Sequence, residues 1–538
     1  MTSVKKVKVA LLALVAALVI AIPTSAFADT IAINSETTGD VYQAYQIFSG
    51  EYATDTTNKA VLSKVRWGNG IPADKQADAL AAIQELEGFE SATDAASVAE
   101  ALANIENNSA AADAFAAAIA PFLTANPYAF GTTNPYTSVA LPDGYYLVKQ
   151  STAGTAANDQ TGAKTKFVAQ LVGPETEITI DAKASVPEVF KGVIEDEDND
   201  GTASFLKALE NYRKDAHYDT NEDIPYYIAG TLPTTYDDYS TYYYEFTDTM
   251  SKGLTYQDDA AVYLAYNGVI PENAEALEDW DIDFTTDSEG ITVLTVKTDN
   301  LKKYVEAYDS TVKVVVLYTA RLNKDCVVGN SGNPNDVDLT YSNNPNSGGE
   351  GEKGKTPKKY AVVFTFALDD TKVDDVDNTV LLANAEFIIG KSATGPWAVI
   401  ENGCVKQWVA DESKASTMKS DSNGKFGVKG LDADSYVIKE TVAPAGYNLK
   451  TDLISFTISA DLPDQATING GTINATVSGE GSAINNGTVS QTVTNKQGGT
   501  LPSTGGIGTT IFTIVGIALI VAAAAIMVVR RRNAAAIQ

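Results

Sequence analysis

The chain has 538 residues, of which 44% are apolar, and its 39 Lys and Arg against 69 Asp and Glu give a formal net charge of −30. This length and apolar share predict two to four domains. The acid excess argues against nucleic acid or an anionic membrane as a partner, because phosphate binding needs a concentrated basic surface. The single histidine, His217, excludes most histidine-based metal sites and nucleophile–histidine pairs.

The N-terminus has the pattern of a secretion signal. Three lysines precede an apolar run over 9–22, and Ala-Phe-Ala at 26–28 offers the small-x-small pattern that signal peptidase accepts. We therefore predict a signal peptide over 1–28 and an exported chain that begins near Asp29.

A mixed α/β domain is predicted over residues 29–182, a segment rich in alanine. Its apolar residues recur at helical spacing over 80–86, 98–105 and 115–122, and strand-like runs follow at 139–149 and 166–172.

Two β-sandwiches are predicted to follow, so that the fold class is mainly β. Residues 183–344 consist of short alternating or β-branched runs separated by turn residues, which is typical of a sandwich. A polar, glycine-rich linker is predicted over 345–358. Residues 359–499 are again strand-rich and form the second predicted sandwich.

The C-terminal segment 501–538 combines three signals in a fixed order. Leu501-Pro502-Ser503-Thr504-Gly505 precedes an uncharged run over 507–529, long enough to span a bilayer, and three arginines follow at 530–532. The order resembles the sorting signal of Gram-positive sortase substrates. In that family the sortase cysteine attacks the Thr carbonyl, here Thr504, and releases the piece that begins at Gly505. The transmembrane helix would then be a temporary anchor.

The most informative string in the third predicted domain is Tyr-Val-Ile-Lys-Glu-Thr-Val-Ala-Pro-Ala-Gly-Tyr at 436–447. In a strand, Tyr436, Ile438 and Glu440 share one face, so a core that holds the first two also holds the glutamate. A buried carboxyl without a cation is favoured in its protonated form and can donate a hydrogen bond. The string resembles the E-box of CnaB-type domains, in which such a glutamate promotes an intramolecular Lys–Asn isopeptide bond. A glutamate on the solvated face is the alternative.

The same resemblance implies two partners for Glu440. Lys372 has the strand parity of Leu368 and resembles the first-strand lysine of CnaB-type domains, while Asn495 shares a face with Val493 on the last strand. In this chemistry a desolvated, neutral lysine attacks the Asn carboxamide, the acid shuttles protons, and ammonia leaves. Lys372, Glu440 and Asn495 form the predicted triad.

The first sandwich repeats the pattern with different residues. Lys191 is flanked by valines at strand spacing, and Asp248 is in phase with Phe246. Alternation along the closing strand favours Asn343 over Asn344. The pattern resembles CnaA-like pilin domains, whose buried aspartate takes the role of the glutamate, and this implies a Lys191–Asn343 bond promoted by Asp248. Ordinary surface positions for all three are the alternative.

The α/β domain carries a near-repeat of the E-box string. Residues 146–150, Tyr-Leu-Val-Lys-Gln, match 436–440 in type, but Gln150 stands where the acid would be. An amide cannot supply the proton, so we predict no isopeptide bond there and expect this domain to be the least stable of the three.

The junction between the first two domains contains a candidate acceptor lysine. Segment 178–187 resembles the pilin-motif region of sortase-assembled backbone pilins, in which a lysine just before the second domain accepts the acyl group from the sortase thioester. The resemblance implies that Lys183 is this acceptor. Lys164 and Lys166 are the alternative acceptors, and a solvated linker lysine is the alternative role for Lys183.

A metal site is not predicted. Asp196, Asp198, Asp200 and Gly201 match the opening positions of an EF-hand loop, but Lys207 occupies the position that requires a bidentate glutamate. We expect an exposed acidic turn at 196–201.

The two cysteines, Cys326 and Cys404, fall in different predicted sandwiches. A disulfide between them would have to clamp the interface of the two domains, and free buried thiols are the alternative. Two cysteines in an exported chain of this length mean that disulfides are not its main source of stability.

Taken together, these features resemble the major (backbone) pilin of a Gram-positive bacterium. The resemblance implies a structural subunit of a cell-wall-anchored pilus, or fimbria, in which a pilus-specific sortase joins Thr504 of one subunit to Lys183 of the next. Its partners would be identical subunits, a minor or tip pilin, peptidoglycan and a host glycan or matrix ligand. No phosphate loop, nucleotide fingerprint or catalytic triad appears, so we expect no cofactor and no enzyme beyond autocatalytic isopeptide formation. A monomeric wall-anchored adhesin that binds host glycan or matrix is the alternative.

Overall fold

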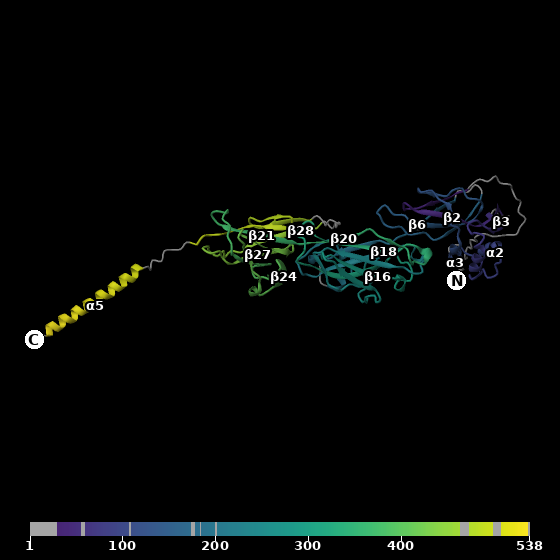
Figure 1. Cartoon of the computed structure of the whole chain (residues 1–538). Helices are drawn as coiled ribbons and strands as arrows, with labels where there is room; N and C mark the ends of the chain where they lie inside the picture. The colour runs from purple at the N-terminus through teal and green to yellow at the C-terminus, as the bar shows by residue number, and fades with distance from the viewer. Residues whose placement is uncertain are drawn as a thin grey trace, which may run out of the picture.

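Three β-rich bodies follow one another along an elongated molecule, and a long helix stands apart at the C-terminal end (Figure 1). We call the three bodies the first, second and third domains. The computed structural model describes residues 29–54, 60–106, 109–173, 178–182, 184–198, 202–462, 473–498 and 507–535. The predicted signal peptide over 1–28 lies outside these residues.

The first domain is the mixed α/β unit that the sequence predicts. Its helices are α1 (Gln76–Gln84), α2 (Ala95–Leu102) and α3 (Ala110–Ile119), with a 3-10 turn η1 (Ala120–Phe122). Asp94 caps α2 by accepting from the Ser97 amide at 2.9 Å, and Ser109 caps α3. The apolar faces of the helices pack around Phe89 and Phe115, whose rings stack 5.6 Å apart.

Two sheets complete the first domain. One has the order β3-β2-β6-β7, with β4 beside β2, and the other has the order β5-β1-β8. The strands are β1 (Ile31–Asn34), β2 (Val41–Thr54), β3 (Ala60–Trp67), β4 (Tyr128–Ala129), β5 (Tyr136–Thr137), β6 (Gly144–Thr152), β7 (Val168–Val172) and β8 (Ile178–Asp181).

The second domain is a sandwich of two sheets, with strand orders β10-β20-β18-β12-β16-β15 and β13-β17-β11-β9. In addition, β19 pairs with β18 and β14 pairs with β17. The elements are β9 (Val189–Val193), α4 (Ala203–Leu206), β10 (Asp215–His217), β11 (Ile224–Thr231), β12 (Tyr244–Met250), β13 (Leu254–Tyr256), β14 (Ala261–Tyr266), β15 (Asp281–Thr286), β16 (Thr292–Thr298), β17 (Val312–Leu322), β18 (Asn333–Ser342), β19 (Lys353–Lys355) and β20 (Lys359–Phe364), with 3-10 turns at η2 (Asp196–Asp198), η3 (Leu209–Asn211), η4 (Tyr236–Asp238), η5 (Leu301–Lys303) and η6 (Pro345–Ser347).

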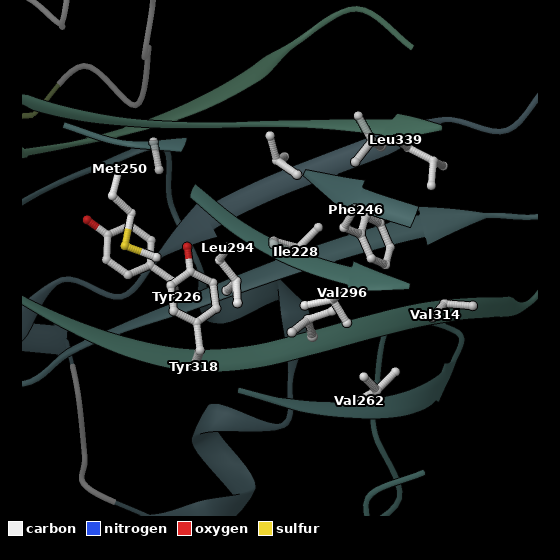
Figure 2. Close-up of a cluster of buried hydrophobic side chains, with 14 of the residues drawn as sticks. Tyr226, Ile228, Phe246, Met250, Val262, Leu294, Val296, Val314, Tyr318 and Leu339 are labelled. Atoms are coloured by element: carbon white, nitrogen blue, oxygen red, sulfur yellow. The ribbon is translucent and has the colours of Figure 1, made fainter. Parts of the chain in front are cut away.

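The core of the second domain lies between its two sheets. Figure 2 shows apolar and aromatic side chains from both sheets meeting there, among them Tyr226, Phe246 and Tyr318. Strict alternation builds this core, because every second residue of β12 is buried. Tyr244, Phe246 and Met250 point inward on that face, and Asp248 shares it.

The boundary between the second and third domains lies later than predicted. We expected a linker over 345–358 and a third domain from Lys359, but both β19 and β20 pair with β18. The polar composition of the predicted linker is compatible with β19 because this strand is short and its two lysines are exposed. Only Thr365 separates β20 from the first strand of the third domain.

The third domain is built from one long, curved run of strands with the order β29-β28-β27-β22-β23-β24-β26-β21-β31-β30. Two further strands, β25 and β32, pair with β22 and β21. The elements are β21 (Phe366–Asp374), β22 (Glu386–Gly390), β23 (Trp397–Glu401), β24 (Cys404–Val409), η7 (Glu412–Lys414), β25 (Met418–Lys419), β26 (Lys425–Leu431), β27 (Ser435–Val442), β28 (Ile454–Asp461), β29 (Asn474–Ser478), β30 (Ala483–Asn485), β31 (Thr488–Ser490) and β32 (Thr492–Asn495). The first strand, β21, runs parallel to the last strand, β32, and next to it.

The C-terminal helix α5 (Ile507–Ala535) is long and apolar enough to cross a bilayer. The most apolar 18 residues within Thr510–Arg532 have a mean hydropathy of 2.9, and they bury nothing against the rest of the described chain. The predicted transmembrane run over 507–529 falls within this helix.

Candidate functional site

The third domain brings the predicted triad together. Lys372 lies on β21, Glu440 on β27 and Asn495 on β32. The Lys372 Nζ donates to Asn495 Oδ1 at 2.7 Å and lies 3.8 Å from Glu440 Oε1. The Asn495 Nδ2 donates to both carboxyl oxygens of Glu440, at 2.9 and 3.0 Å. Three strands that are far apart in sequence therefore deliver an amine, a carboxamide and a carboxyl to one point.

The triad is shut off from solvent. The side chains of Lys372 and Glu440 have no exposed surface, and Asn495 is 3% exposed. Burial lowers the pKa of the Lys372 amine to about 8, although the Glu440 carboxylate opposes the shift, and the charge of Lys450 adds to the lowering. With this pKa about a tenth of the amine is neutral at pH 7, far more than for an ordinary lysine, and a neutral amine is the nucleophilic form.

The arrangement suits transfer of the Asn495 acyl group to Lys372. The amine touches the carboxamide that it must attack, and the carboxyl of Glu440 touches the amide nitrogen that must leave. Attack of Nζ on Cγ forms the new C–N bond, and the bond from Cγ to Nδ2 breaks. The Glu440 carboxyl supplies a proton to the departing Nδ2 and takes one proton back from Nζ, so that ammonia is released and the acid is restored. The Lys450 amide holds the carboxyl in place by donating to Oε2 at 2.6 Å.

The second domain has a comparable buried cluster around Lys191. The Nζ of Lys191 donates to the Asp248 carboxylate and, at 2.7 Å, to the Tyr318 hydroxyl. It also lies 5.2 Å from the ring centres of Tyr226 and Tyr318. Burial lowers the pKa of Lys191 and raises the pKa of Asp248, although each charge opposes the shift of the other. Burial therefore favours a neutral amine beside a protonated acid.

The carboxamide at this cluster belongs to Asn335, a residue that sequence alternation did not single out. Asn335 has no exposed surface, and its Nδ2 donates to the Tyr318 hydroxyl at 2.7 Å. Tyr318 in turn donates to Asp248 at 3.1 Å and accepts from Lys191. The Oδ1 of Asn335 has no hydrogen-bond partner among the described residues. Asn335 thus has an amide oxygen free to be polarised beside a buried lysine and acid.

The predicted residue Asn343 lies elsewhere. Its Nδ2 donates to the Gly162 carbonyl at 3.2 Å, and its own carbonyl accepts from the Lys164 amide at 2.7 Å. It follows Asn335 by eight residues, which is roughly 26 Å along a strand. Asn343 therefore sits against the first domain, and the structure does not bring it to Lys191 and Asp248.

In the first domain, a glutamine occupies the sequence position that corresponds to the glutamate of the triad. Gln150 is 2% exposed, its Nε2 donates to Asp40 Oδ1 at 2.7 Å, and its Oε1 accepts from the Thr165 amide at 2.9 Å. The same Asp40 oxygen accepts from the Gly154 amide. Gln150 thus serves as a structural hydrogen-bonding residue, and the absence of an isopeptide bond in this domain stays a prediction.

The predicted joining residues Lys183 and Leu501 to Gly505 lie outside the described residues, as do Asp200 and Gly201 of the acidic turn. The alternative acceptors are held in ion pairs. Lys164 is 8% exposed and pairs with Glu352. Lys166 pairs with Asp113 at 2.6 Å and with Asp238 at 3.3 Å.

The residues on both sides of Lys183 line an open hollow of about 890 Å³ between the first two domains. Asp181, Ala182 and Ala184 form one wall, and Asp237 and Asp238 form part of the opposite wall. The described residues that flank position 183 therefore lie at a surface recess.

Comparison with known proteins agrees with this domain order. Residues 221–345 match the family model of Gram-positive pilin backbone subunit 2, a Cna-B-like domain. Residues 368–472 match the SpaA prealbumin-like fold domain, and residues 493–535 match the LPXTG cell-wall anchor motif. The three matches fall on the second domain, the third domain and the C-terminal helix region.

One curated sequence and one solved structure are similar over most of the chain. The trypsin-resistant surface T6 protein of Streptococcus pyogenes serotype M6 is 25% identical over 415 residues, which is 66% of this chain and 70% of that protein. The solved structure of the T6 backbone pilin of serotype M6 Streptococcus pyogenes is described as a modular three-domain structure. It covers 88% of this chain and 100% of its own, with 16% identity and a TM-score of 0.54, so it supports the fold.

Proposed function

We propose that this chain, a cell-wall-anchored backbone pilin of the Gram-positive type, is polymerised by an amide bond from Thr504 of one subunit to Lys183 of the next. The sorting signal implies sortase-linked polymerisation and attachment of the fibre to peptidoglycan. The recess that Ala182 and Ala184 line supports this choice of acceptor, because the threonine arrives at the end of a neighbouring subunit. The ion pairs of Lys164 and Lys166 make those amines poorer nucleophiles.

Two internal isopeptide bonds are proposed to stiffen each subunit. One joins Lys372 to Asn495 with Glu440 as promoter, and the other joins Lys191 to Asn335 with Asp248 as promoter. The single observation that carries this proposal is the contact of a buried amine with both a carboxamide and a carboxyl in the third domain.

The placement of the bonds suits a fibre under tension. Lys372 and Asn495 lie on the neighbouring first and last strands of the third domain, so a bond between them lets force pass from one end of the domain to the other. The strands between the first and the last strand of the domain then bear little of the tension.

At the outermost subunit, Lys183 has no preceding backbone subunit to join. A minor or tip pilin with its own sorting signal would be attached there. The fibre would carry this tip, and any surface that binds a host glycan or matrix, away from the cell wall.

Thr504→Ala is expected to abolish both polymer and wall attachment, because alanine cannot form the acyl donor that both reactions use. The measurement is migration of wall extracts and culture medium in boiling detergent gels, in which a covalent pilus gives a ladder. Ser503→Ala is the matched control, because that position of the motif is the variable one. A ladder that survives Thr504→Ala would refute the proposed joint.

Asn335→Ala is expected to remove the isopeptide bond of the second domain, whereas Asn343→Ala is expected to leave it intact. Asn343→Ala is the matched control, because it removes the same carboxamide from a residue that lies eight positions further along the chain, just beyond the end of β18. The intact mass of the purified ectodomain decides between them, since a missing bond adds one ammonia to the mass after correction for the substitution. Loss of the bond in Asn343→Ala, with retention in Asn335→Ala, would restore the original assignment.

A further inference from the structure

The two cysteines of the chain meet at the interface of the second and third domains. Cys326 lies in the turn after β17, and Cys404 is the first residue of β24. Both are buried, with exposed fractions of 7% and 3%. The Cys404 thiol donates to the Lys324 carbonyl at 3.9 Å, and the two thiols contact each other through a hydrogen bond. The fold thus brings together two thiols that are far apart in sequence.

Polar contacts fix the interface on both sides of Cys404. The carbonyl of the next residue, Val405, accepts from Asn221 Nδ2 at 2.8 Å and from the Thr220 hydroxyl at 2.5 Å. The turn that carries Cys326 is held from the other side, where the Asn330 amide donates to Asn486 Oδ1 at 3.0 Å. The two thiols are therefore aligned by contacts that do not depend on the sulfur atoms.

The environment also favours thiolate chemistry. The hydrogen bond from Cys326 lowers the pKa of the Cys404 thiol to about 7, and the charge of Lys429 acts in the same direction. A surface hollow of about 670 Å³, lined by Cys326, Gly403 and Lys429 among others, opens on the Cys326 side of the pair. A small disulfide can approach the cysteines through this hollow.

We propose that Cys326 and Cys404 form a disulfide after export, as a covalent clamp between the second and third domains. The oxidant is a disulfide donor, either an exported thiol–disulfide oxidoreductase or a small-molecule disulfide. The Cys404 thiolate attacks one donor sulfur, which gives a mixed disulfide and releases the first donor thiolate. Cys326, whose pKa is raised chiefly by its interaction with Cys404, then gives up its proton and attacks the Cys404 sulfur, which releases the second donor thiolate. The pair loses two protons and two electrons, and the donor takes them up to become two thiols.

The disulfide would enclose the part of the chain that lies outside both rings closed by the proposed isopeptide bonds. The proposed bonds close rings over 191–335 and 372–495, so residues 336–371 lie outside both. A disulfide from Cys326 to Cys404 closes a ring that contains this stretch and overlaps both others. This consequence rests on the proposed function, but formation of the disulfide does not.

The test uses the full protein released from the cell wall. Free thiols are alkylated before reduction, and the digest is then compared with and without reductant. The expected result is no alkylation before reduction and one trypsin-derived species that joins peptide 392–406 to peptide 325–353. Peptide 325–353 contains Asn335 and so also carries the peptide of Lys191 through the proposed isopeptide bond, and reduction is expected to release peptide 392–406 alone. Either of two outcomes overturns the proposal. In the first, both cysteines are alkylated before reduction and form only mixed adducts with oxidised glutathione. In the second, the cysteines form disulfides between chains.

Serine variants separate the cross-link from simple packing. Cys326→Ser and Cys404→Ser are expected to melt at a lower temperature than the oxidised wild type, because the ring is open. Under reductant the wild type is expected to fall to the level of the variants. A wild-type melting temperature that reductant leaves unchanged would contradict the clamp, whether or not the isopeptide bonds form.

Discussion

Glu440→Gln is expected to leave the third domain folded but without its isopeptide bond. Glutamine keeps the size of the side chain, and its single amide oxygen, at the position of Oε2, can still accept from the Lys450 amide and from Asn495. It cannot deliver a proton to the leaving nitrogen, so the acyl transfer stops. The variant ectodomain should therefore retain one ammonia that the wild type loses, after correction for the substitution.

Loss of the isopeptide bond should lower the free energy of unfolding of the third domain by a large amount. Lys372 and Asn495 are separated by 123 positions, and by the chain-closure model used for disulfides a ring of this length stabilises the folded state by about 5 kcal/mol. That corresponds to a fall in melting temperature on the order of 20 °C for a domain of this size. The matched control is Glu412→Gln, which removes an exposed ion pair with Lys439 on the outer face of the same strand and should change neither mass nor melting. A Glu440→Gln ectodomain with the wild-type loss of ammonia would show that Glu440 is not the promoter.

Lys183→Ala is expected to abolish the pilus ladder while leaving monomer on the wall. The reason is chemical, because the sortase thioester formed at Thr504 needs an amine from the next subunit, whereas peptidoglycan supplies its own amine. The readout is the detergent-resistant ladder in wall extracts, together with mass spectrometry of the peptide that joins Thr504 to Lys183.

The control variants for this prediction are Lys164→Ala and Lys166→Ala. Both lysines lie close to the junction of the first two domains but are engaged with acidic partners, so both variants should still polymerise. A ladder that persists in Lys183→Ala and vanishes in either of the others would move the acceptor to that residue.

The triad of the third domain could be predicted from the sequence because the resemblance to CnaB-type domains named its members and strand alternation puts each of them inward. The predicted inward face of the first strand is buried even at a position where the sequence has a charged residue. Asp370, two residues before Lys372, is also fully buried, and burial raises the pKa of its carboxyl to about 8. One of its oxygens accepts from the Gln491 amide at 2.8 Å.

The carboxamide of the second domain could not be predicted in the same way. Alternation identifies the face of a strand, and Asn335 and Asn343 share one face of β18 and its extension. Alternation does not identify the position along the strand, because that position is set by which residues pair across the sheet. Met250 opposes Asn335 and Val337 opposes Asp248, so only the pairing of β12 with β18 shows that Asn335 reaches the cluster.

Interactions between domains were also beyond the sequence pattern. The glycine-rich stretch after residue 345 predicted a linker, but its end returns to the sheet as the exposed edge strand β19. The contact of Cys326 with Cys404 likewise depends on how two separately folded units dock, which no periodicity within either unit records.

The intact mass of the wild-type ectodomain, residues 29–500, measured under reducing conditions, tests the central claim most directly. Reduction opens any disulfide, so the remaining deficit counts internal amide bonds alone. The account predicts the sequence mass less two ammonia molecules, with cross-linked peptides that join Lys191 to Asn335 and Lys372 to Asn495. A mass equal to that of the unmodified sequence would contradict it.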